Sequence, residues 1–195
     1  MNYYTKVIKL DSNIAKSKNK ALKEALKSDK NYFFLIEENC EVVDDSVYQK
    51  FIDTSDATGI HALMWAREDI NKRLPFDDDK WIQYYMDFVS TFSMFTRKAV
   101  ETVGFFDEKM PPNTWQELEY AKRIGDNELS SPFGMFASPR GIDNCFRITK
   151  PNKEYKNIGE LDAALKYWES KQLEDFPIEI KNKEVEASKP VLEML

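Results

Sequence analysis

The pattern of apolar and polar residues along the chain predicts strands that alternate with helices. Residues 33–36 form an apolar run, Phe-Phe-Leu-Ile, which is typical of a buried strand in a sheet covered on both faces. In residues 14–28 the apolar positions recur at helical spacing with lysines opposite, which indicates an amphipathic helix. The polar residues of segment 11–13 precede this helix and are suited to capping it. The alternation favours an α/β sheet.

The remaining elements follow from the same kind of spacing. We expect strands at 7–10, 57–65 and 88–95, and helices that follow Asp44-Asp45 and cover 97–103, 114–124 and 158–173. Gly104 would end the helix at 97–103, because glycine commonly lies just beyond a helix C-terminus. Residues 66–86 give no clear pattern, and residues 127–150 read as loops and short strands. We expect one domain over residues 1–175, followed by an edge strand or loose tail over residues 176–195.

The buried run at 33–36 ends abruptly on polar residues, Glu37-Glu38-Asn39. In one interpretation the strand simply reaches the protein surface there. In the other, the carboxylate and amide oxygens serve as ligands for a hard cation. The second interpretation has a structural basis, because ligands of open α/β sheets sit outside the carboxyl ends of the strands.

Composition and charge narrow the classes of protein to which the chain can belong. Apolar residues make up 42% of the 195 residues, which suits a folded globular protein. The net charge of -6 argues against nonspecific binding of nucleic acid or of an anionic membrane. Cys40 and Cys145 form no C-x-x-C pair, so a reduced cytoplasmic protein is the better interpretation. We see neither a signal peptide nor an apolar run long enough for a membrane span.

Three stretches, in this order, resemble the GT-A-type glycosyltransferases, especially the large inverting group known as family 2. They are NIAKSKNKALKEA at 13–25, FFLIEENCEV at 33–42 and FSMFTRKAVETVGFFDEKMPPNTWQELEYAKR at 92–123. The third stretch is the most specific, because many spaced positions agree at once. The resemblance implies a GT-A-like (Rossmann-like) open mixed sheet with helices on both faces. It also implies transfer of a sugar from a nucleotide-sugar donor to a glycan or other hydroxyl acceptor, with inversion at the sugar.

On the donor side, the resemblance assigns roles to residues of the first two stretches. Glu37 and Asn39 stand at the positions of the family's Asp-x-Asp motif, whose acids hold Mn²⁺ or Mg²⁺ against the donor diphosphate. Asn19 and Glu38 are implied to contact the donor. Two departures weaken these roles. Glu and Asn replace the two aspartates, and we expect the chain to be truncated at the N-terminus, without most of the half that holds the nucleotide base.

On the acceptor side, the resemblance places Glu117 at the catalytic base, which takes a proton from the attacking hydroxyl. Trp115 and Gln116 are implied to contact the acceptor. Each residue also has a plain structural interpretation. Thr114 and Glu117 fit a capping box at a helix start, and Trp115 is as well suited to core packing as to a sugar ring.

Several alternatives stay open from the residues alone. Asp77-Asp78-Asp79 is a rival acidic metal motif, although an acidic loop in solvent is its simpler interpretation. The single histidine, His61, lies in an apolar run and reads as a satisfied, half-buried side chain. The altered acids favour a second hypothesis, a GT-A-like binding or interaction module without turnover. A sheet edge left open by missing strands would favour a homo-oligomer.

Overall fold

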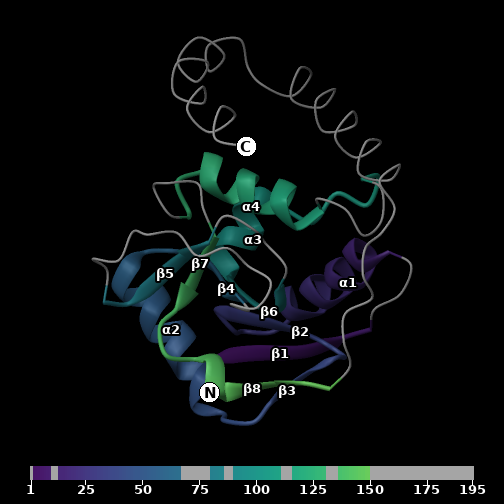
Figure 1. Ribbon diagram of the computed structural model, residues 1–195. Coiled ribbons are helices and arrows are strands. Elements are labelled where there is room, and N and C mark those ends of the chain that lie inside the picture. The colour runs from purple at the N-terminus through teal and green to yellow at the C-terminus, as the bar shows by residue number, and fades with distance from the viewer. Residues whose placement is uncertain are drawn as a thin grey trace, which may run out of the picture. The chain divides into compact units, whose positions relative to one another are not determined.

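The computed structural model describes residues 2–9, 13–66, 80–85, 90–110, 116–130 and 136–149. Its centre is a four-stranded mixed sheet in the order β1-β2-β6-β4 (Figure 1). These strands are β1 (Tyr3–Ile8), β2 (Tyr32–Glu37), β6 (Ser90–Thr96) and β4 (Ala62–Ala66). Strand β1 runs parallel to β2, whereas β6 is antiparallel to both of its neighbours. The α/β fold class is therefore confirmed.

Two short strand pairs accompany the central sheet. The first joins β3 (Cys40–Val42) to β8 (Phe146–Ile148), and the second joins β5 (Ile82–Tyr85) to β7 (Phe136–Pro139). Both pairs are antiparallel. Strand β3 follows β2 directly, after the turn at Glu38-Asn39. Thr149 N donates to Asn39 O at 2.8 Å, which ties the end of β8 to this turn.

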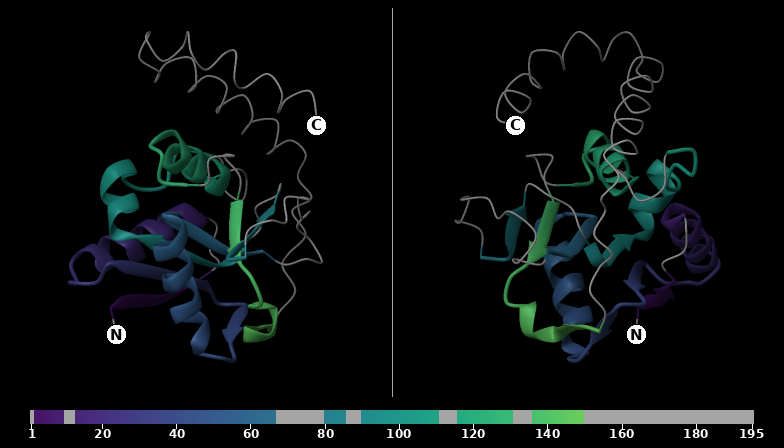
Figure 2. Two further views of the ribbon diagram at one scale, coloured as in Figure 1. Left: turned by 90° about the vertical axis from the view of Figure 1, so that its left-hand side faces the viewer. Right: turned by 45° about the vertical axis from the view of Figure 1, so that its right-hand side comes forward.

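Helices cover both faces of the central sheet (Figures 1 and 2). They are α1 (Ile14–Leu26), α2 (Ser46–Thr58), α3 (Arg97–Val103) and α4 (Gln116–Asp126), together with a 3₁₀ turn η1 (Asp143–Cys145). The core on one face contains α2 residues, and the core on the other contains residues of α1, α3 and α4. None of the helices among the described residues is long and apolar enough to cross a membrane.

Strand β2 is buried on both faces, as the apolar run predicts. Phe34 and Ile36 belong to the core that contains α2, while Phe33 and Leu35 belong to the core on the opposite face. Successive side chains of a strand point to opposite faces, so four consecutive apolar residues serve two cores at once. Hydrogen-bonded partners on both sides, β1 and β6, make β2 a central strand.

Local capping explains where the best-predicted helices begin and end. The side chain of Asn13 accepts a hydrogen bond from Lys16 N at 3.1 Å at the start of α1. Thr96 caps α3 in the same way, accepting from Ala99 N at 3.2 Å, and Gly104 follows the last residue of this helix. These side chains satisfy backbone N–H groups that have no partner within the helix. Helix α3 has the predicted bounds.

Two predicted strands differ from the structure in their bounds. Strand β1 begins at Tyr3, well before the predicted start at Val7. The predicted strand at 57–65 is wrong in its first half, because α2 continues to Thr58 and ends at Gly59, whose φ is 72°. A glycine adopts this left-handed conformation without steric cost, so it stops the helix and lets β4 begin at Ala62.

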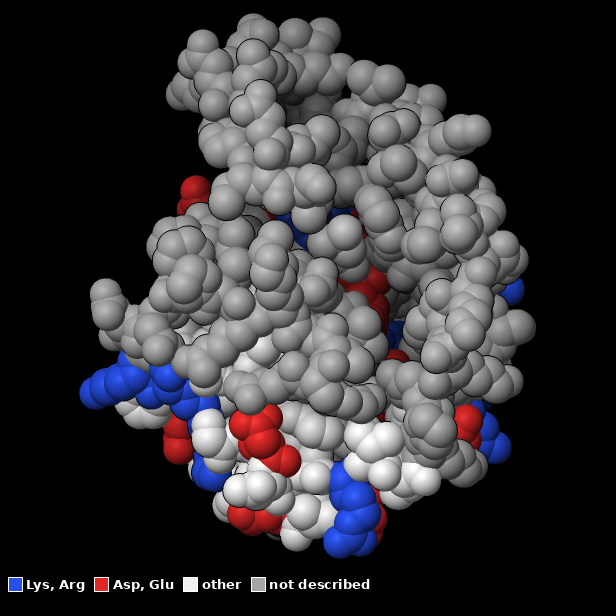
Figure 3. Space-filling view, viewed as in Figure 1, with Lys and Arg blue, Asp and Glu red and all other residues white. Residues whose placement is uncertain are grey.

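Several predictions fall on residues outside the described ranges. These are the helix at 158–173, the tail at 176–195 with its boundary at 175, the acidic run at 77–79, and residues 114 and 115. The chain divides into two compact units, Met1–Lys156 and Asn157–Leu195, and every described residue belongs to the first. On the face shown in Figure 3, the described surface carries Lys/Arg and Asp/Glu side chains side by side. Among the described residues no strand pairs with the outer edge of β1, and the homo-oligomer stays a prediction.

Candidate functional site

The first component of the site is Glu37, the last residue of β2. Its position follows from the strand itself, because the apolar run before it is fixed between β1 and β6. The side chain of Glu37 is 9% exposed. Asn39 is also buried, whereas Glu38 between them is exposed, and its backbone N–H donates to Ile8 O at 2.9 Å. The acidic end of the strand is therefore not a simple exit into solvent.

The second component is Glu117, in the first turn of α4. A carboxylate at this place is favoured by the positive end of the helix dipole. The side chain of Glu117 is 17% exposed, so it is mostly enclosed but still reachable. The predicted cap Thr114 and acceptor residue Trp115 lie outside the described residues.

The third component is Lys18 of α1, which joins the two carboxylates. Its side chain is 2% exposed, and its ammonium group forms an ion pair with Glu117 Oε1. The same nitrogen lies 3.8 Å from Glu37 Oε1 and 5.7 Å from the centroid of the Phe106 ring. We call Lys18, Glu37 and Glu117 the Lys18 cluster. The two acids, which are far apart in the sequence, thus meet at one ammonium group.

The Lys18 cluster contains two carboxylates and only one ammonium group, all of them largely buried. Burial raises the pKa of Glu37 to about 7, with Lys18 opposing this shift and the charge of Glu117 adding to it. Burial also raises the pKa of Glu117, again against the effect of Lys18. Burial is the largest cause of both shifts, and at Glu37 the negative charge of Glu117 adds to it.

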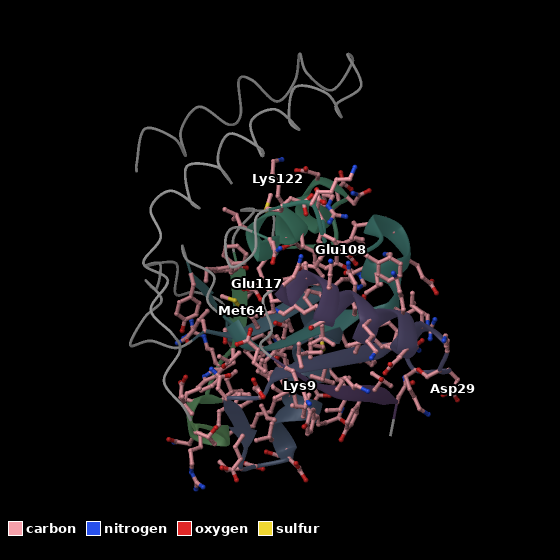
Figure 4. All side chains as sticks on the ribbon, turned by 90° about the vertical axis from the view of Figure 1, so that its right-hand side faces the viewer. Lys9, Asp29, Met64, Glu108, Glu117 and Lys122 are labelled. Atoms are coloured by element: carbon pink, nitrogen blue, oxygen red, sulfur yellow. The ribbon has the colours of Figure 1, made fainter. Side chains whose placement is uncertain are left out.

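Asn19 holds α1 in the position that brings Lys18 to the acids. Its Nδ2 donates to Phe106 O and to Glu108 Oε1, each at 2.9 Å, and its Oδ1 accepts from Phe106 N at 2.8 Å. Figure 4 marks Glu108 and Glu117 on the chain segments that face α1. The described partners of Asn19 are therefore in the protein itself, and its contact with a donor stays a prediction.

Gln116 points inward at the start of α4. It is 1% exposed, and its Nε2 donates to Met110 O at 3.2 Å. Its Oε1 has no hydrogen-bond partner among the described residues. This burial indicates that Gln116 anchors the segment before α4, and its contact with an acceptor stays a prediction.

A small cavity of about 20 Å³ lies beside Glu117. Met64, Phe95, Phe106 and Tyr120 are among its mainly apolar lining residues, and Figure 4 shows Met64 close to Glu117. A cavity of this size holds one water molecule rather than a sugar ring. Glu117 therefore has an apolar wall on this side, which strengthens its interaction with Lys18.

The donor atoms at the end of β2 do not fit the expected Mn²⁺ or Mg²⁺ ion. Within the described ranges, no group of three or more His, Cys, Asp or Glu side chains is arranged to hold a metal ion. In addition, the ammonium of Lys18 already lies beside Glu37, where it would repel a second cation. Metal ligation by Glu37 and Asn39 stays a prediction that this arrangement does not favour.

Lys18 is the residue that sequence reasoning missed, although the sequence contains a signal for it. Ile14, Ala15, Ala21, Leu22 and Ala25 form the buried stripe of α1. Lys18 lies three or four residues from the neighbouring members of this stripe, so it occupies an apolar position of the helix. A lysine there predicts a buried cation that needs acidic partners.

Comparisons with known proteins do not assign the chain to a family. No family model matches the chain, and no curated protein gives a significant match.

Proposed function

We propose that the chain is a GT-A-like glycosyltransferase that moves a sugar from a nucleotide-sugar donor to a hydroxyl acceptor, with inversion. One observation carries the proposal: Glu37 and Glu117, from two separate family-like stretches, meet at Lys18. The mixed sheet with helices on both faces agrees with the architecture that the resemblance implies. Neither the sheet nor the charge cluster alone would suggest this activity.

Glu117 is the proposed catalytic base. The acceptor oxygen attacks the anomeric carbon, the bond from this carbon to the phosphate oxygen breaks, and the electron pair leaves with the nucleotide. The proton of the acceptor hydroxyl passes to Glu117. Burial raises the pKa of this carboxyl, which makes it a better proton acceptor near neutral pH, while Lys18 favours its ionised form.

A second candidate is a GT-A-like binding module without turnover. It is favoured by the ion pairing of both acids with Lys18, since a carboxylate held by an ammonium group is a weaker base than one without such a partner. The two candidates share a ligand class and differ in turnover.

The test uses the full chain with UDP-, GDP-, dTDP- and CMP-sugars, measured by thermal melting and by release of the nucleotide. A donor at a hundred times its dissociation constant should stabilise the protein by about 2.7 kcal/mol. Glu117→Gln should keep this stabilisation and lose turnover about 10²–10⁴-fold. Glu41→Gln is the control, because Glu41 is half exposed and pairs only with Arg147 among the described residues.

Each outcome separates the candidates. Stabilisation with turnover that Glu117→Gln removes supports the transferase. Stabilisation without turnover in the native protein supports the binding module. If none of the donors stabilises the protein and none is turned over, the transferase proposal is overturned.

A further inference from the structure

The Lys18 cluster already contains a cation at the place where the sequence predicts a metal ion. The predicted metal ligand, Glu37, and the predicted base, Glu117, face the same ammonium group. Lysine is almost never fully buried unless it is paired, and Lys18 is 2% exposed. The two acids therefore act together as the counter-charge of one protein side chain.

The backbone fixes Lys18 at this place. Ala15, Ala21, Leu22 and Ala25 of α1 are at most 1% exposed, so the helix is tightly packed on both sides of Lys18. Asn19, the next residue, makes three hydrogen bonds to the segment that contains Phe106 and Glu108. The packing of α1 and the hydrogen bonds of Asn19 thus fix the ammonium group beside the two carboxylates.

A divalent ion at Glu37 would compete with this ammonium group. Metal–oxygen bonds are about 2 Å long, so an ion on the facing oxygen would lie within roughly 6 Å of Lys18 Nζ. At that distance a divalent charge and a unit charge repel each other, and the burial of the site keeps water and salt from screening this repulsion. Of Glu37 and Asn39 only Glu37 carries a charge, and Lys18 already offsets part of it.

We propose that Lys18 is the resident cation of this site, that it takes the place of a divalent metal ion, and that it positions Glu117. The inference rests on the proposed function only for the role of Glu117 as a base. The exclusion of the metal follows from the three side chains themselves. Any activity of this site then needs no Mn²⁺ or Mg²⁺.

The experiment uses the metal alone as the probe, so its result does not depend on the identity of a donor. The full chain and its Lys18→Met variant are titrated with Mn²⁺, and binding is followed by thermal melting and by the electron paramagnetic resonance signal of free Mn²⁺. We expect no shift and no loss of signal for the native protein at millimolar Mn²⁺. We expect the variant to gain a Mn²⁺-dependent stabilisation of several degrees, because two buried carboxylates then lack their cation.

Control variants locate the effect. Lys18→Arg keeps the positive charge and should exclude Mn²⁺ as the native protein does. Adding Glu37→Gln to Lys18→Met should abolish the gained binding. If Lys18→Met does not fold, the native protein and Lys18→Arg still decide, because failure of both to bind Mn²⁺ supports the proposal.

Three results would overturn the proposal and leave the proposed transferase standing. The first is Mn²⁺ binding by the native protein that Glu37→Gln removes. The second is a folded Lys18→Met variant that gains no Mn²⁺ binding. The third is donor turnover that stops with a chelator and resumes with Mn²⁺ or Mg²⁺. Absence of turnover with every donor, by contrast, would overturn the transferase while the metal titration still tests the role of Lys18 as the cation.

Discussion

The two ends of strand β2 carry polar sites of opposite character. At the amino end, a groove of about 560 Å³ is lined by Tyr32, Asp56, His61 and Lys98, among others. At the carboxyl end, the Lys18 cluster lies beside a cavity of only about 20 Å³. Volume alone would place a ligand at the amino end.

The charges favour the opposite choice. At the amino end, the Tyr32 hydroxyl donates to Asp56 Oδ1 at 2.5 Å, and His61 Nδ1 lies 2.9 Å from Thr96 Oγ1. Arg97 donates there to the carbonyl oxygens of Leu26, the last residue of α1, and of Ser28 and Lys30, which follow the helix. These contacts join chain segments, and the groups are close to water. The Lys18 cluster instead holds an excess of acid away from water, which is typical of a functional site.

The largest expected effect comes from removing the cation at the carboxyl end. Lys18→Met removes the cation that pairs with both buried carboxylates among the described residues, and it should cost about 3–5 kcal/mol of unfolding free energy at pH 8. The matched change at the amino end is Lys98→Met, on an exposed side chain that lines the groove, which should cost at most about 0.5 kcal/mol. Chemical denaturation at pH 8 measures both.

The loss should shrink at pH 5, where the acids of the Lys18→Met variant can take up protons. Equal losses for the two lysine variants, or a loss at Lys18 that does not change with pH, would contradict the charge imbalance.

The elements around β2 differ in how well the sequence predicts them. Phe33–Ile36 could be predicted as a buried strand because an uninterrupted apolar run has few other interpretations. The end of α3 could be predicted from the local signal of Gly104. The β3–β8 pair could not be predicted, because its strands have three residues each and meet across about a hundred residues of chain. Such a pairing depends on the rest of the fold rather than on a local pattern.

The site itself was predicted in part. The resemblance gives Glu37 and Glu117 separate roles on the donor and acceptor sides, and no spacing along the chain links one residue to the other. Lys18 does not stand out in the sequence because its helix is rich in lysine, and only its spacing from the apolar stripe distinguishes it from the other lysines. Asn19 shows the same limit of one-dimensional patterns, since its partners near Phe106 are supplied by the fold.

The second prediction concerns pH at the carboxyl end. The pKa of Glu37 is raised to about 7 in the folded protein from an ordinary value of 4.5. Between these values the folded state binds more protons than the unfolded state, so stability is full below pH 4.5 and is lost as the pH rises toward 7. Glu37→Gln should remove this loss, which is on the order of 1–3 kcal/mol.

The measurement is the unfolding free energy of native protein and variant at pH 5 and pH 8. The variant should match the native protein at pH 5 and be more stable than it at pH 8, because glutamine has the shape of the protonated acid. A variant that is less stable at pH 8 would show that the ionised carboxylate stabilises the fold, contrary to the charge count.

The third and smallest effect lies at the amino end and has the opposite sign. Burial lowers the pKa of His61, and the nearby charge of Lys98 lowers it further, while Asp56 opposes both. The unfolded chain therefore binds more protons than the folded protein as the pH falls below about 6.5, so this end loses stability toward acid. His61 is partly exposed, and solvent screening limits the loss to a few tenths of a kcal/mol.

His61→Asn keeps an amide group near Thr96 Oγ1 and cannot take up a proton. It should therefore reduce the loss of unfolding free energy between pH 7 and pH 5. Because the raised pKa of Glu37 makes the protein more stable toward acid over the same interval, the two effects are best separated in the Glu37→Gln background, where the contribution of Glu37 is absent. If the double variant still loses stability toward pH 5 as steeply as Glu37→Gln alone, His61 is not the group that titrates at this end of the strand.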